Sequence, residues 1–134
     1  MNPRKLRELM ALADARKARD LARLDRLFGV ARGLDAAAAA AAAAPRRDHA
    51  DGGYAGAPMA LQGTRQVWAD HRVAEARRAQ AALAPEIAAA RAAAVQSLGK
   101  HAALVHLLAR AERDAAAQLD ARAERDAPSP APKG

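Results

Sequence analysis

The sequence predicts an all-α protein, an elongated antiparallel two-helix coiled coil, and two observations support this fold class. Alanine supplies 43 of the 134 residues and arginine 18, and both are strong helix formers. Between Pro85 and Asp126, apolar residues recur at steps of three, four and seven, which keeps one face of a helix apolar for about eleven turns. A helix of that length needs a partner helix to cover the face.

Composition also limits the core that these helices can share. Leu, Ile, Val and Phe together number only 21, and the net charge is +7, a combination that by rule of thumb is typical of disorder. The helix propensity of alanine opposes that interpretation and favours long helices without a thick core. Because cysteine is absent, no disulfide framework or thiolate site can form.

The first helix is expected over residues 3–44. Asn2 can cap it, and Pro3 suits the first helical position because proline has no N–H to lose there. A seven-residue repeat follows, interrupted by Lys17 and Asp20. Its apolar members are Leu6, Met10, Ala13, Leu24, Leu27, Ala31 and Leu34.

Prolines and glycines predict the rest of the domain, which we expect to span residues 1–127 as a single helical hairpin. Pro45 is expected to end the first helix, and the glycine-containing stretch 45–57 reads as an exposed loop. The second helix is expected over 58–126, kinked at Pro85; a break there would give a three-helix bundle instead. The proline-punctuated tail, 128–134, is expected to be disordered.

These bounds predict how the two helices pair. An antiparallel hairpin with them sets residues whose numbers sum to about 102 opposite each other, so that Leu6 faces Leu98 and Leu34 faces Trp68. Everything beyond about His101 then overhangs. The overhang holds the densest aliphatic cluster in the chain, which would mark an interaction surface; its members are Leu104, Val105, Leu107 and Leu108.

The motifs of catalysis and metal binding are not found in the sequence. His101 and His106 are five apart, which puts them on different helix faces, and neither has a metal-ligand spacing. Lys100 follows a glycine but lacks the glycine-rich loop of a phosphate site. We therefore expect no enzyme activity, no cofactor and no metal.

Charge and hydropathy suggest partners only weakly. A sequence pI near 11.0 raises the alternative of a basic nucleic-acid-binding helical protein, but stacking aromatics are nearly absent. No segment approaches the roughly 20 apolar residues of a membrane span. We expect a cytoplasmic protein with no small-molecule substrate.

A resemblance to a known family rests on the late run LGKHAALVHLLARAERDAAAQLDARAERD. A small residue, a glycine, a basic residue, an aliphatic-rich turn and a charged tail follow one another there, as Ser97, Gly99, Lys100, Leu104, Leu108 and Glu124 to Asp126. With two long helices and a lone aromatic early in the second, the chain resembles the FliJ family of the flagellar type III export apparatus.

The resemblance implies a coiled-coil stalk that enters the ring of the export ATPase and escorts export chaperones, peripheral at the inner-membrane export apparatus. The overhanging stripe and the neighbouring end of the first helix would face the ring, through Leu6, Leu9, Met10, Leu104 and Leu108. The family contacts the export gate early in the second helix, the region of Val67, Trp68 and His71. A general helical adaptor or scaffold is the alternative.

Overall fold

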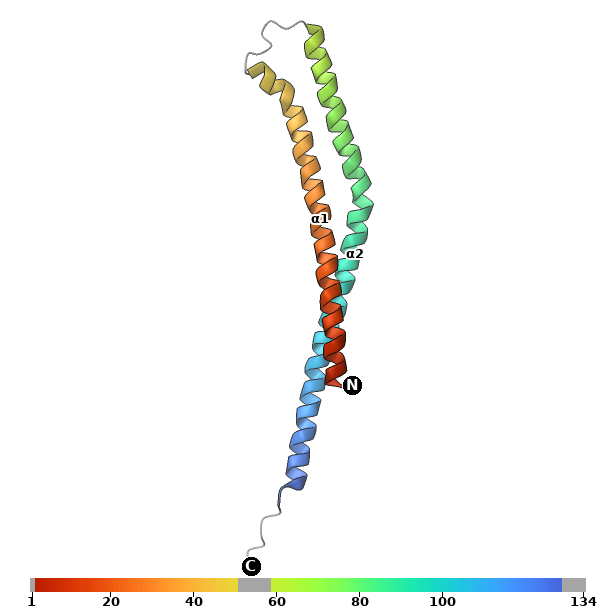
Figure 1. Cartoon of the computed structure of the whole chain (residues 1–134), viewed down its shortest axis with the longest axis vertical. Coiled ribbons are helices and arrows are strands. Elements are labelled where there is room, and N and C mark those ends of the chain that lie inside the picture. The colour runs from red at the N-terminus through yellow and green to blue at the C-terminus, as the bar shows by residue number, and fades with distance from the viewer. Residues whose placement is uncertain (1, 51–58, 129–134) are drawn as a thin grey trace, which may run out of the picture. The chain divides into compact units, whose positions relative to one another are not determined.

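The computed structural model describes residues 2–50 and 59–128, with side chains for 2–44 and 62–128. Helix α1 spans Pro3–Ala50 and helix α2 spans Met59–Asp126 (Figure 1). The remaining described residues form no strand, which confirms the all-α class. The chain divides into two compact units. The first unit is Met1–Arg19 with Val95–Gly134, and the second unit is Asp20–Ala94.

Helix α1 begins as predicted. The Oδ1 atom of Asn2 accepts a hydrogen bond of 3.0 Å from the backbone N–H of Arg4. The carbonyl of Asn2 accepts the first helical bond, 3.2 Å from the N–H of Leu6. Asn2 is therefore the N-cap, and one of the free N–H groups of the first turn is satisfied by its side chain.

Neither interior proline ends a helix. Helix α1 continues through position 45 to Ala50, so the predicted end at residue 44 is wrong. Pro85 lies inside α2, which continues without a break and excludes the three-helix bundle. An interior proline costs about 3 kcal/mol, but both prolines follow alanine-rich stretches, which favour the helix strongly. The predicted loop beyond residue 50 and the tail from 129 lie outside the described residues.

The predicted seven-residue repeat of α1 is the face that packs against α2. Buried and half-buried positions recur along α1 at alternating steps of three and four, which is the spacing of a coiled-coil seam. Lys17 and Asp20 do not interrupt this seam but occupy two of its positions, and Asp20 is buried. The seam positions are Leu6, Met10, Ala13, Lys17, Asp20, Leu24, Leu27, Ala31, Leu34, Ala38 and Ala41.

The seam of α2 is built mainly from small residues. In the second unit its positions include Ala69, Ala76, Leu83, Ile87, Ala90 and Ala94, and in the first unit Ser97, His101, Leu104, Leu108, Ala111 and Ala115. Among the described residues, six of the eight buried apolar side chains are alanine, and Leu6 is the one large side chain that is fully buried. Alanine at the contact lets two helix backbones approach closely.

Interhelical contacts fix the pairing in each unit. In the first unit, Asp14 Oδ1 lies 3.4 Å from His101 Nε2. In the second, Asp35 Oδ1 accepts a hydrogen bond of 2.6 Å from Gln80 Nε2. The helices are antiparallel in both, and the residue numbers of both pairs, 14 with 101 and 35 with 80, sum to 115. The predicted sum of about 102 is therefore wrong. Ending the first helix at residue 44 accounts for about half of the difference, because the observed helix ends, 50 and 59, sum to 109.

This register moves the unpaired part of α2 toward the C-terminus. In the first unit Leu6 lies beside Leu107 and Ala111 rather than opposite Leu98, and every residue from Ala116 to Asp126 is exposed. In Figure 1 the last part of α2, drawn in blue, continues past the start of α1. The overhang therefore begins at about residue 116 and not at His101.

The corrected register predicts unequal effects of two neighbouring leucines. Leu108 is buried and Leu107 is 41% exposed. Leu108→Ala should lower the free energy of unfolding by about 2 kcal/mol, because it leaves a gap in the seam. Leu107→Ala should change it by about 0.5 kcal/mol or less.

Urea unfolding followed by circular dichroism at 222 nm measures both variants. Equal losses for the two leucines, or a larger loss for Leu107→Ala, would contradict the register.

Candidate functional site

Most of the residues predicted to face an ATPase ring are internal. All five belong to the first unit, where Leu6 is 1% and Leu108 9% exposed. Met10 and Leu104 are half-buried seam residues, and only Leu9 lies outside the seam, exposed. The register error explains the difference, because residues assigned to an overhang in fact pair with α1. Four of the five therefore hold the two helices together, which corrects their assignment to a partner surface.

The residues predicted for a gate-binding patch are exposed. Val67 is 68% exposed and Trp68 53%, and the side chain of His71 is also largely exposed. They lie within one turn of each other on α2, in the second unit. A half-exposed tryptophan beside an exposed valine is typical of protein contact surfaces, where aromatic residues are enriched.

Trp68 forms one edge of an open groove between the two helices of the second unit. It lies against the alanine-rich part of α1. The observed register does not set it opposite Leu34, because 34 and 68 sum to 102 and not to 115. The groove residues from α1 are Leu34, Ala37, Ala40, Ala41 and Ala44, and those from α2 are Trp68, Arg72, Glu75, Ala76 and Ala79. Its floor is therefore apolar and lined with small side chains, and its α2 edge combines the aromatic ring with charge.

Sequence reasoning missed the charged residues that flank Trp68. The guanidinium carbon of Arg72 lies 5.5 Å from the centroid of the Trp68 ring, within cation–π distance. Glu75 contacts Arg72 at 3.7 Å and the Nε2 atom of His71 at 2.9 Å. Their spacing of three and four residues was the available signal, because such residues are neighbours on a helix surface. The chain of contacts orients the indole ring at the groove edge.

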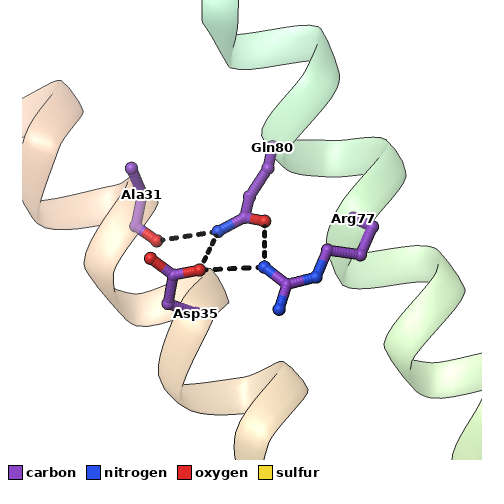
Figure 2. Close-up of polar contacts among 4 residues, drawn as sticks. All are labelled: Ala31, Asp35, Arg77 and Gln80. Atoms are coloured by element: carbon purple, nitrogen blue, oxygen red, sulfur yellow. Dashed lines mark hydrogen bonds and ion pairs between the residues drawn. The ribbon is translucent and has the colours of Figure 1, made fainter.

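A polar cluster of four residues also joins the two helices of the second unit (Figure 2). Asp35 of α1 accepts hydrogen bonds from Arg77 Nη1 at 2.9 Å and from Gln80 Nε2 at 2.6 Å. Gln80 also accepts a 2.7 Å bond from Arg77 and donates a 3.4 Å bond to the carbonyl of Ala31. Two hydrogen bonds lower the pKa of Asp35 below its usual value. The bond from Gln80 has the larger effect, and the bond from Arg77 is second.

The groove at Trp68 has the geometry of a docking surface. Among residues 2–44 and 62–128, no three His, Asp or Glu side chains are grouped so that they could hold a metal ion. Tightly placed nucleophile and base pairs are likewise missing from the groove lining. An apolar groove with an oriented aromatic edge suits a protein side chain or helix.

One stretch of α1, Pro3–Ala44, is long and apolar enough, by length and composition, to cross a membrane, with a mean hydropathy of 1.3 in its most apolar window. The expectation that no segment approaches a span therefore needs correction. The run of nine alanines, Ala36 to Ala44, supplies much of that hydropathy. One such helix is weak support for membrane insertion, because core helices of soluble proteins meet the same criterion.

No protein-family model, curated protein or solved structure matches this chain. The functional interpretation consequently rests on the residues and on the surfaces described above.

The polar cluster predicts an acid-sensitive part of the stability. Because folding lowers the pKa of Asp35, its stabilising contribution is present above about pH 4, the usual range for an unfolded aspartate. It is lost as the pH falls through the lower folded-state pKa. Asp35→Asn should therefore destabilise the protein at neutral pH and make little difference in strong acid.

Urea midpoints for wild type and Asp35→Asn, compared at neutral pH and near pH 2.5, measure this effect. Asp25→Asn on the same helix is the control, because Asp25 forms no hydrogen bond or ion pair among the described residues. If the difference in urea midpoint between wild type and Asp35→Asn were the same at both pH values, the prediction would be contradicted.

Proposed function

We propose that this chain is a non-enzymatic component of flagellar type III protein export, a FliJ-like coiled-coil stalk that engages the export ATPase ring and escorts export chaperones. The observation that carries the proposal is the unpaired end of α2 in the first unit. Residues from Ala116 to Asp126 are helical and exposed, and they include the charged tail on which the family resemblance rests. The protein would act in the cytoplasm, peripheral at the inner-membrane export apparatus.

The unpaired end suits insertion into a ring better than the residues first assigned to it. Leu119 is 63% exposed and lies among charged residues of both signs, Asp120, Arg122 and Glu124. A helix end of this kind offers one apolar side chain for burial, worth roughly 1.5–3 kcal/mol, and charges that orient it. Leu104 and Leu108 then keep the stalk paired rather than touching the ring.

The groove at Trp68 would be the contact for the export gate. Its position early in α2 matches the region that the resemblance assigns to that partner. Because Trp68 is the only tryptophan, its fluorescence reports on this surface alone, and a bound partner should shift the emission to shorter wavelength.

A general helical adaptor or scaffold is the second candidate, and the exposed groove favours it independently of the resemblance. An adaptor needs a docking surface but no ATPase. The two functions therefore differ in whether the chain changes ATP hydrolysis. Dispersed cations alone would not hold DNA at 200 mM salt, because they bind phosphate weakly at that ionic strength. Retention on DNA at this salt concentration would therefore favour the nucleic-acid-binding alternative over both of these functions.

Stimulation of the export ATPase from the same organism tests the proposal. Wild-type protein should raise the hydrolysis rate, and Leu119→Asp should abolish the increase while leaving the helix content unchanged. Val95→Asp is the matched control, since Val95 is 65% exposed in the first unit but lies on the paired part of α2. A wild-type protein without effect, or equal loss in both variants, would contradict the stalk function.

A further inference from the structure

The first unit carries a second surface that the proposed function does not use. It consists of the residues that immediately precede seam positions on both helices. We call it the basic leucine face; its members are Lys5, Leu9, Leu12 and Arg16 of α1 and Lys100, Ala103, Leu107 and Arg110 of α2, all exposed.

Helix geometry places these residues on one side of the unit. In an antiparallel pair, positions one before the seam lie on one side of both helices, and positions one after it lie on the other. The contact between Arg7 and Glu112, 3.0 Å apart, joins two residues that follow seam positions. The contact between Arg7 and Glu112 therefore lies on the side of the unit opposite to the basic leucine face.

The register arranges the face in four layers. Lys5 lies level with Arg110, Leu9 with Leu107, Leu12 with Ala103, and Arg16 with Lys100. Two apolar layers are thus bounded at each end by a pair of cations, about 16 Å apart along the helix axis. Leu12, at 63%, is among the most exposed large apolar side chains of the first unit.

The four cations have no partner of their own. Within the residues that the structure describes, Lys5, Arg16, Lys100 and Arg110 form no hydrogen bond or ion pair, whereas Arg4 contacts Glu8 and Arg7 contacts Glu112. Their charge is therefore available to an external acidic group. A cation that is already paired would have to give up its partner first.

The face also leads into a hollow. Leu107 and Arg110 line a recess beside the start of α1, together with Pro3, Leu6, Ala111 and Asp114. A recess of this kind accepts a projecting side chain, such as a leucine from a helix. A planar layer of lipid headgroups has no such side chain, so the recess favours a protein partner. The repeat of leucines at a step of three on α1 matches the spacing of side chains on a docked helix.

We propose that the basic leucine face binds an acidic amphipathic α-helix of a partner protein. The helix would place two apolar side chains on the leucine layers and Asp or Glu about 11 residues apart on the two cation pairs. This inference stands apart from the export function, because it uses neither the unpaired end of α2 nor the groove at Trp68.

A fluorescently labelled synthetic helix tests the proposal with the full-length chain. The peptide carries two leucines three residues apart, flanked by glutamates eleven residues apart, and its binding is followed by fluorescence anisotropy. Binding should be saturable and should weaken steeply with salt. A peptide with lysine in place of the glutamates should not bind.

Matched variants locate the contact. Lys100→Glu should weaken binding about tenfold or more, because it reverses a charge opposite the peptide carboxylates. Arg113→Glu makes the same charge change on α2 outside the face and should stay within about twofold of wild type. Leu12→Ser should weaken binding, whereas Val95→Ser should not.

Three outcomes would overturn the proposal. They are absence of peptide binding by the wild-type protein, equal loss in Lys100→Glu and Arg113→Glu, and binding to vesicles of phosphatidylserine and phosphatidylcholine in place of the peptide. Circular dichroism of each variant checks that its helix content is retained. A concentration-dependent mass in sedimentation without peptide would assign the face to a second copy of this chain.

Discussion

The small size of the side chains between the two helices is the constraint on which the structure depends. Alanine fills most of the buried apolar positions, and burial contributes roughly 25 cal/mol for each Å² removed from water. Each alanine therefore adds little, and the two buried leucines, Leu6 and Leu108, contribute more than any of the buried alanines. In exchange, small side chains let the backbones approach, and high helix propensity keeps both helices formed with little tertiary support.

A seam whose fully buried apolar positions are mostly alanine specifies its register weakly, because sliding one helix often exchanges one alanine for another. Polar contacts make the choice. In the second unit, Asp35 bonds to both Arg77 and Gln80. In the first unit, Asp14 Oδ1 lies 3.3 Å from Lys17 Nζ and 3.4 Å from His101 Nε2. Polar residues in a seam cost stability and specify alignment, which explains why Lys17 and His101 occupy seam positions.

The sequence alone was sufficient for the features that depend on local chemistry. The cap at Asn2 and the seven-residue repeat both follow from residue type and spacing. Three of the four helix ends lie within one residue of the positions that capping and proline signals predict, and α2 runs through Pro85 as expected. Only the end of α1 differs, because the nine alanines before Pro45 favour the helix strongly enough for it to continue to Ala50.

The error at Pro45 carried over to the site. A helix end misplaced by six residues accounts for about half of the error in the pairing. The pairing in turn decides whether Leu104 and Leu108 are a partner surface or a core. Trp68, Val67 and His71 were unaffected, because their exposure depends on one helix face. The contacts of Arg72 and Glu75 at the groove edge could be predicted from their spacing in the sequence. That they lie beside the alanines of α1 in one groove could be seen only in the folded structure.

The distance between two spin labels, at Ala11 and Ala109, tests the register most directly. The chain has no cysteine, so Ala11→Cys and Ala109→Cys supply the only attachment points, and both positions are exposed in the first unit. The observed register sets position 109 about 7.5 Å along the axis from the residue opposite Ala11, and the register summing to 102 sets it about 27 Å away. Pulsed electron paramagnetic resonance should give the short separation. The long separation would contradict the pairing and return Leu108 to an exposed overhang.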